Sequence, residues 1–360
     1  MAQDRTESAF RGQARAWLTA HVGPYRVTGP FVPFDDALRE RARGWQRELH
    51  AGGWAGLGWP VEHGGRGLGP ALRVIWAEEL GAAGAPPAVN LLGEAIVGPA
   101  VMAHGTPAQQ DRYLQPILSG DELWCQLFSE PGAGSDLAAA TTSARPEWVV
   151  DGHKTWSSGA QHADFGLLLG RTGEHRHRGL TCFVVDMRQR GVSVRPVRQM
   201  TGGAAFADVI LDAARAEPLG PIGGGWAVAK TTLEEERLQL GLGLARTGGN
   251  VDRVLAALRP AGDPHLRQLA GQLVVDARCA RHLAARVGAG PEAALAKLAS
   301  ARVSRRYDEL VDAMRGSGAM LVDEHTPLQL WLPATRIAGG TDEVLKDVIA
   351  ERVLGMPKER

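Results

Sequence analysis

Two segments rich in glycine and serine carry side chains suited to holding a flat ligand with a polar edge. They are Leu127–Asp136, which reads LFSEPGAGSD, and Lys154–Gly159, which reads KTWSSG. The glycines of the first segment let backbone N–H groups and the Ser135 hydroxyl approach a ligand closely. The Trp156 indole offers a flat stacking surface. These residue types predict a wall for a planar heterocycle, although the same composition also suits an ordinary β-hairpin loop with serines in its turns.

A single glutamate is the candidate acid–base group. By its spacing, one face of a predicted helix contains Ala229, Leu233, Glu236, Leu240 and Leu244. Glu236 is the only acid on this face, and a carboxylate among apolar side chains is costly unless it is paired or neutralised. Glu236 is therefore a candidate functional acid. The alternative is that Glu234–Glu236 form a solvated acidic patch in the first half of the helix.

The elements that must position these residues change character twice along the chain. Helical periodicity dominates the first part and returns in the last, whereas the middle contains short runs rich in Val, Phe, Trp and Leu. The predicted strands are Leu123–Phe128, Trp148–Val150, Phe165–Leu169, Leu180–Val185, Val192–Val197 and Val209–Leu211. Asp151-Gly152 predicts a hairpin turn within this region.

This pattern predicts an α+β protein with three domains. We expect an N-terminal α domain (1–120), a middle antiparallel β domain (121–222) and a C-terminal helical bundle (223–360). The helix candidates of the last domain are Trp226–Ala245, Val251–Leu258, His265–Val287, Pro291–Arg315 and Thr341–Leu354.

Composition excludes some classes of function. Lys plus Arg equals Asp plus Glu at 40 each, so charge gives no argument for nucleic acid or an anionic membrane as a partner. The first residues carry acids and lack an apolar core, which argues against a secretory signal. No apolar run of about 18 residues occurs, so no membrane-spanning helix is expected.

Cysteine and histidine usage predicts neither a disulfide framework nor a metal site. Cys125, Cys182 and Cys279 are scattered and odd in number, which fits buried free thiols in a reducing cytoplasm. The histidines give no His-Glu-x-x-His spacing. We therefore expect a cytoplasmic protein without a bound metal.

The motifs, taken in order, resemble those of the acyl-CoA dehydrogenase family. Besides the two glycine–serine segments, the resemblance rests on Trp54–Gly67, Arg178-Gly179, Arg198–Gly202, Ile337–Glu343 and Glu351–Gly355. It implies an α/β/α fold in which FAD lies between the β region and the C-terminal helices. It also implies α,β-dehydrogenation of an acyl thioester, carried by CoA or an acyl carrier protein, with an electron-transferring flavoprotein as acceptor.

The resemblance also assigns the catalytic groups. Many members place a glutamate base just before a Gly-Thr near the C-terminus, where this chain has Gly339. The branch that includes isovaleryl-CoA dehydrogenase carries the base in a Glu-Arg pair on a mid-chain helix, which matches Glu236-Arg237. Glu236 would then take the α proton while flavin N5 accepts the β hydride. The Gly339 N–H would help to polarise the thioester carbonyl, and Glu234 and Arg237 would contact the substrate.

The flavin contacts implied by the resemblance come from both glycine–serine segments and from the chain's last part. Gln126, Phe128 and Ser129 are expected at the pyrimidine edge, and Trp156 and Ser158 by the ring face and N5. Ser135 is expected by the pyrophosphate or the pantetheine arm, and Thr341 and Glu343 on the ribityl or adenosine side. Gly134 is a further expected cofactor contact. Ser135 is therefore a candidate substrate contact as well.

Two family segments are missing from this chain. The Arg-x-x-Phe-Gly segment, which a neighbouring subunit commonly lends to the flavin pyrophosphate, does not follow Gly248–Asn250, and the segment that usually cradles the adenine is reduced to the glycines of Asp312–Gly318. This asymmetry resembles bacterial heteromeric acyl-CoA dehydrogenases, in which one subunit keeps the base and a sister subunit lends pyrophosphate contacts. The chain is thus expected to be the base-bearing subunit of a heteromer, or else a homo-oligomer that grips its flavin differently.

Two other functions fit the same sequence. The loss of the glutamate at Gly339 favours a non-catalytic or half-site partner subunit of a heteromeric enzyme. The same fold could also serve an oxidase or monooxygenase that uses oxygen, because oxygen access depends on packing near flavin N5. The sequence does not identify the acyl group.

Overall fold

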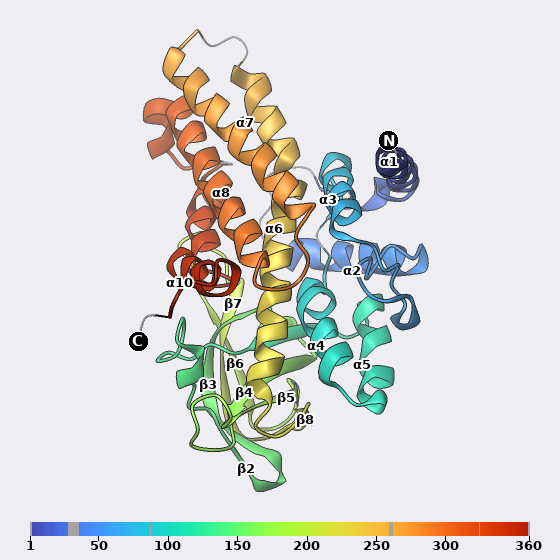
Figure 1. Cartoon of the computed structure of the whole chain (residues 1–360), viewed down its shortest axis with the longest axis vertical. Coiled ribbons are helices and arrows are strands. Elements are labelled where there is room, and N and C mark those ends of the chain that lie inside the picture. Colours follow the sequence, from blue (N-terminus) through green and yellow to red (C-terminus); the bar gives the residue numbers. More distant parts are fainter. Residues whose placement is uncertain (1, 28–35, 87, 259–261, 324, 359–360) are drawn as a thin grey trace. The chain divides into compact units, whose positions relative to one another are not determined.

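The chain folds into two compact units, each assembled from separate parts of the sequence. The computed structural model describes residues 2–27, 36–86, 88–258, 262–323 and 325–358 (Figure 1). The helical unit comprises Met1–Val32, Leu68–Pro86 and Glu234–Arg360, and the β-containing unit comprises Pro33–Gly67 and Pro87–Leu233.

The helical unit is built from amphipathic helices that bury apolar faces against one another. Its helices are α1 (Ala2–His21), α3 (Pro70–Ala83), α6 (Gly225–Leu258, which enters the unit at Glu234), α7 (Pro264–Ala284), α8 (Ala293–Arg315), α9 (Thr326–Trp331) and α10 (Asp342–Val348). Helices α6, α7 and α8 run side by side (Figure 1). Leu273, Val303 and Leu310 are central to their shared core.

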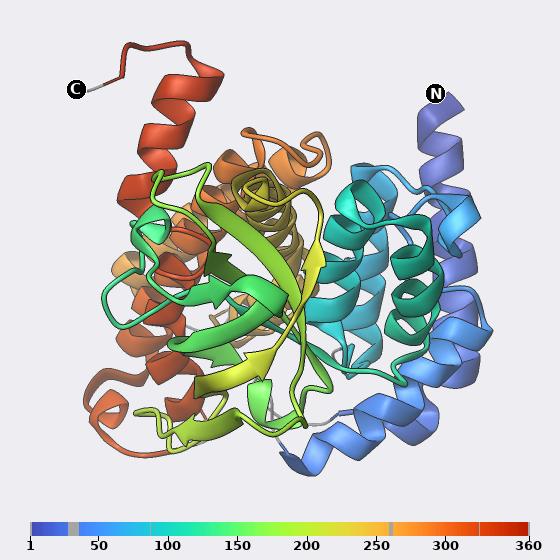
Figure 2. The ribbon, with the colours of Figure 1, turned by 90° about the horizontal axis from the view of Figure 1, so that it is seen from below.

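In its described residues, the β-containing unit holds a mixed sheet, the first part of α6 and three further α-helices. The helices are α2 (Asp36–Ala51), α4 (Gly98–His104) and α5 (Pro107–Ser119). The strands are β1 (Trp124–Leu127), β2 (Ser143–Arg145), β3 (Val149–Ser158), β4 (Phe165–Arg171), β5 (Leu180–Asp186), β6 (Val192–Val197), β7 (Phe206–Arg215) and β8 (Glu217–Leu219). Their order is β6-β7-β3-β2-β4-β5-β8, with β1 paired to β4, and Figure 2 shows them mostly in green.

The predicted β domain is confirmed, but its strands are not all antiparallel. Strands β1 and β2 both pair with β4 in parallel, while the other pairings are antiparallel. Parallel pairing requires a long crossover between the paired strands, and the chain between β1 and β4 contains the glycine-rich segment. The departure from the antiparallel pattern is thus linked to the segment of chemical interest.

The predicted hairpin turn at Asp151-Gly152 is wrong. Both residues lie inside β3, where the pairing with β7 shifts register between Val150 and Gly152. A Cβ on Gly152 would come within 2.4 Å of the Thr142 Oγ1, so the glycine is needed for close strand packing rather than for a turn. The turn before β3 is instead made at Pro146–Trp148.

Two further expectations need correction. Cys125 and Cys182 are buried free thiols, as predicted, but Cys279 is exposed on α7. The two helices expected over 226–245 and 251–258 are one continuous helix, α6, because the glycines at 248 and 249 do not end it. Within the described residues, no helix is long and apolar enough to cross a membrane.

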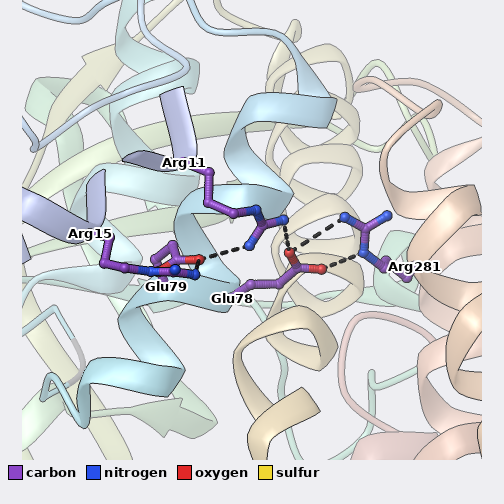
Figure 3. A network of polar contacts seen from close by, with 5 residues as sticks. All are labelled: Arg11, Arg15, Glu78, Glu79 and Arg281. Carbon is purple, nitrogen blue, oxygen red and sulfur yellow. Dashed lines mark hydrogen bonds and ion pairs between the residues drawn. The ribbon is translucent and has the colours of Figure 1, made fainter. Parts of the chain in front are cut away.

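An ion-pair network joins α1, α3 and α7 inside the helical unit (Figure 3). Glu79 of α3 accepts hydrogen bonds from Arg11 at 2.8 Å and from Arg15 at 2.9 Å. Its neighbour Glu78 accepts from Arg11 at 2.6 Å and pairs with Arg281 of α7. Burial opposes the ionisation of Glu79, but the hydrogen bonds from Arg15 and Arg11 outweigh it and hold its pKa below the ordinary 4.5.

The substitution Glu79→Ala is expected to lower the free energy of unfolding at pH 7 by about 2 kcal/mol, because two guanidinium groups lose a charged acceptor. A carboxyl whose pKa is lower in the folded state stabilises the fold above its unfolded pKa and loses this effect as the pH falls. The difference between the variant and the natural chain should therefore shrink below about pH 4. Denaturant unfolding at pH 7 and below about pH 4 measures this difference. Equal stability of the variant and the natural chain at pH 7 would contradict the prediction.

Candidate active site

The glycine loop, defined here as residues 128–142, connects β1 to β2 and leaves an open surface. Glu130 and Ala133 exchange two backbone hydrogen bonds of 3.0 Å, which makes a tight turn at its start. Beyond this turn, Gly134 and Ser135 are exposed. A Cβ added to Gly132 or Gly134 would meet no atom within 4 Å, so a ligand has free access to the backbone here.

The structure brings the two glycine–serine segments together. The Thr155 N–H donates to the Ser129 carbonyl at 2.9 Å, and the Lys154 ammonium donates to the Phe128 carbonyl at 3.0 Å. Both carbonyls are therefore engaged within the protein. The N–H groups of Phe128 and Ser129 and the Ser129 hydroxyl are the other polar groups that a ligand could contact here. Gln126 lies on β1, two residues before Phe128, and is half-buried.

A β-bulge turns Trp156 outward. The pairing of β3 with β7 shifts register between Lys154 and Ser157, and Trp156 between them has φ +56° and is 61% exposed. A tryptophan in the left-handed region is strained, and bulges re-aim side chains at functional positions. The edge of its ring meets Phe206 at 5.7 Å between centroids. Ser158 is half-buried at the end of β3, so it stays available as the second predicted contact.

In the helical unit, the carboxylate of Glu236 lies beside Gly339. A Cβ on Gly339 would be 3.6 Å from the Glu236 Oε1. Gly339 is buried and has φ +68°, a conformation that suits glycine. The carboxylate that α6 supplies thus lies next to the point where a side chain at position 339 would begin.

Two buried cations hold the glycine turn at 339 and 340. The Arg237 Nε donates to the Gly339 carbonyl at 3.2 Å, and the Lys297 Nζ donates to the Gly340 carbonyl at 2.8 Å. Burial lowers the pKa of Arg237, and nearby acids, Glu236 first among them, oppose that shift. In the described part of the chain, no hydrogen bond joins the Gly339 N–H to another residue. The turn therefore combines an anchored backbone and an N–H without a partner among the described residues with a carboxylate close to Gly339.

The remaining predicted residues lie around this turn. The Thr341 hydroxyl accepts from the Val344 N–H at 3.3 Å and caps α10, while Glu343 is exposed in the first turn of that helix. Glu234 is half-buried at the point where α6 enters the helical unit. Arg237 directs its Nε to the Gly339 carbonyl, as described above.

Sequence reasoning missed a second acid on α6, the half-buried Glu235. Burial raises its pKa; Arg73 opposes the shift and Glu234 adds to it. Its place in the Glu234–Glu236 run gave no signal, because the apolar periodicity selects only Glu236. A half-buried carboxyl with a raised pKa is a candidate general base, so Glu235 is the rival to test against Glu236.

Comparison with known proteins covers nearly the whole chain. Family models match the acyl-CoA dehydrogenase N-terminal domain over residues 4–121, the middle domain over 125–214 and the C-terminal domain over 223–354. The acyl-CoA dehydrogenase IpdE1 of Mycobacterium tuberculosis is 39% identical, with 97% of this chain and 98% of that protein covered. The acyl-CoA dehydrogenase FadE34 of the same organism is 34% identical over 83% of this chain and 44% of that protein.

Solved structures show the same architecture. A steroid acyl-CoA dehydrogenase, Tcur3481-Tcur3483, matches with a TM-score of 0.81 and 29% identity over 99% of this chain and 98% of that chain. The ChsE4-ChsE5 complex from Mycobacterium tuberculosis matches with a TM-score of 0.83 and 26% identity over 98% of both chains. Both names join two components.

Proposed function

The chain belongs to the acyl-CoA dehydrogenase family, an FAD-dependent family of oxidoreductases, and from this premise we propose that Glu236 is its catalytic base. One observation carries the proposal: the Glu236 carboxylate lies 3.6 Å from where a Cβ at position 339 would be. Position 339 is where many family members carry the base. In this chain α6 supplies a carboxylate to the same region from a different position in the sequence. The substitution Glu236→Gln tests this assignment.

The residues of the two glycine–serine segments fit the flavin of this family. The open backbone at Gly134, the exposed indole of Trp156 and the Ser129 hydroxyl offer N–H donors, a stacking face and a polar contact. When bound, FAD supplies the acceptor for the hydride that leaves the β carbon of the thioester. We propose that Gln126, Phe128, Ser129, Gly134, Ser135, Trp156 and Ser158 hold it in the β-containing unit, with Thr341 and Glu343 contributing from the helical unit.

The chain's own groups would act on the α carbon and the thioester carbonyl. Glu236 would take the α proton, and the Gly339 N–H would donate to the carbonyl oxygen as negative charge develops there. Arg237 and Lys297 hold the carbonyls of residues 339 and 340 and so anchor the turn directly after that N–H. We propose that Glu234 lines the approach of the substrate and that Arg237 supports the turn against which it binds.

We propose that the substrate is a bulky, steroid-derived acyl-CoA and that the enzyme is a heteromer. The related Tcur3481-Tcur3483 structure is a steroid acyl-CoA dehydrogenase whose name joins two components, and the related ChsE4-ChsE5 structure is a complex of two named proteins. The absence of Arg-x-x-Phe-Gly after residue 250 supports the need for a sister subunit. An electron-transferring flavoprotein is the proposed acceptor of the electrons.

The chain purified alone is expected to be colourless and to gain an oxidised-flavin absorption spectrum only with a co-expressed sister subunit. Bleaching of that spectrum by steroid-type acyl-CoAs, but not by short straight-chain acyl-CoAs, would support the substrate class. A chain that is yellow alone and is bleached by acyl-CoA would instead establish a self-sufficient homo-oligomer. Bleaching by short straight-chain thioesters alone would refute the steroid assignment.

A further inference from the structure

A lysine and a glutamate form an ion pair in the interior of the β-containing unit, at the base of the glycine loop. The Lys154 Nζ lies 2.8 Å from the Glu130 Oε1, and the two side chains are 0% and 6% exposed. Glu130 belongs to the first glycine–serine segment and Lys154 to the second, so the pair links the two motifs through charge.

Lys154 uses two of its three donors on the glycine loop and the third on β4. Besides Glu130, its ammonium donates to the Phe128 carbonyl at 3.0 Å and to the Leu169 carbonyl of β4 at 2.7 Å. An ammonium has three N–H donors, so none is left over. Phe128 directly precedes Ser129, and Lys154 is two residues before Trp156. The position of the lysine head therefore fixes both segments against β4.

Glu130 closes the glycine loop from its other end. Its Oε2 accepts from the Thr141 N–H at 2.7 Å and from the Thr141 hydroxyl at 2.8 Å, while its Oε1 accepts from the Thr142 N–H at 2.9 Å. The stretch between these contacts contains Gly134 and Ser135. A change at Glu130 would release the end of the loop that returns to β2.

Stability alone does not explain a buried ion pair at this place. An apolar pair of similar size is often equally stable, because taking two charges out of water is costly. Burial lowers the pKa of Lys154 to about 8 against the attraction of Glu130. Burial would raise the pKa of Glu130, but Lys154 and the hydrogen bonds bring it to about 2. Both groups are therefore charged at pH 7, and their hydrogen bonds are directional and charge-assisted.

We propose that Lys154 and Glu130 are positioning residues for the flavin, and that this buried pair sets the geometry of both flavin-contacting segments. The proposal rests on the flavin contacts proposed above for Ser129, Ser135 and Trp156. The pair acts through these residues and through the open backbone of the loop, and its members contact neither the cofactor nor the substrate.

The test uses the double variant Lys154→Met/Glu130→Gln, which leaves no unpaired charge in the interior and is therefore expected to fold. The single variant Lys154→Met, which leaves Glu130 buried without its partner, is expected to be clearly less stable. The first measurement is the Kd for FAD in the full chain, with the sister subunit where flavin binding requires it. The second is amide hydrogen exchange at Thr141 and Thr142 in the chain alone.

The double variant is expected to bind FAD at least about tenfold more weakly and to exchange the Thr141 and Thr142 amides faster. Glu79→Gln, which breaks the ion-pair network of the helical unit, is the matched control and should leave both readouts unchanged. Natural affinity and natural exchange in the double variant would overturn the proposal. So would an equal loss of affinity in the control, because the effect would then follow from general destabilisation.

The two readouts separate this inference from the proposed flavin contacts. If the natural chain binds no FAD in any combination, the flavin assignment fails, while the exchange measurement still decides whether the pair orders the loop. If FAD binds normally to the double variant although exchange is faster, the loop is ordered by the pair but does not position the flavin, and the proposal is overturned.

Discussion

Replacing Glu236 by glutamine is expected to lower kcat by about 10³-fold, a typical contribution of a general base. Glutamine has nearly the shape of glutamate and keeps one acceptor oxygen, but it cannot take up the α proton. The carboxylate lies next to Gly339, whereas binding of the acyl-CoA is expected to depend on other contacts. The Kd of the thioester should therefore change little, and the melting temperature should stay close to that of the natural enzyme.

The matched control for this prediction is Glu235→Gln. Glu235 is the next residue on the same helix, it is half-buried, and its pKa is raised by burial and by Glu234. Turnover should survive this substitution, since Glu235 has no place beside Gly339 in the proposed chemistry. Steady-state turnover of both purified variants, assembled with the sister subunit where required, compares them directly.

The opposite pattern would move the base to Glu235. Unchanged turnover in both variants would remove the acid–base role from this stretch of α6 and support a non-catalytic partner subunit. The ionisation of Glu235 carries its own signature. A carboxyl whose pKa is raised in the folded state makes the fold less stable as the pH rises from the ordinary pKa to the raised one. Glu235→Gln should therefore be at least as stable as the natural chain at pH 7.

The order of helices and strands could be predicted because hydrophobic periodicity is a local property. The strands at Phe165–Leu169 and Val192–Val197 were placed within two residues of their ends in the structure. The Asp151-Gly152 turn failed for a non-local reason. Its glycine is required by Thr142 packing against it, and Asp-Gly is a turn signal only where nothing else demands the glycine.

The site shows the same division between local and tertiary information. The motif residues could be selected from the sequence because glycine, serine and tryptophan have distinctive backbone freedom, hydroxyl groups and ring surfaces. The burial of Lys154 and Glu130 could not be predicted, because each is an ordinary charged residue in the sequence and only the folded sheet encloses both. Similarly, the approach of Glu236 to Gly339 joins residues far apart in the chain. No spacing rule reaches over that distance.

Gly339→Ala is expected to lower both stability and turnover. A non-glycine residue at φ +68° is strained by about 1 kcal/mol, and the new Cβ would come within 2.5 Å of the Leu240 Cδ1. Leu240 must then move, and overpacking of this kind adds about 1–3 kcal/mol. Because Leu240 shares a helical face with Glu236, the shift should also displace the carboxylate. A displacement of about 1 Å can lower kcat about a hundredfold.

Gly355→Ala is the control that separates backbone strain from packing. Gly355 also has φ +68°, but a Cβ there would meet nothing within 4 Å. Gly355→Ala should lose only the stability that corresponds to the strain and should keep full turnover. Gly339→Ala should lose more stability and part of its turnover. Adding Leu240→Ala to Gly339→Ala removes the clash and should restore part of the turnover. Denaturant unfolding measures the stability of each variant, and kcat measures its turnover. If both glycine variants lost the same stability and both stayed fully active, crowding at Gly339 would have no role in holding Glu236, and the geometry proposed for the base would be wrong.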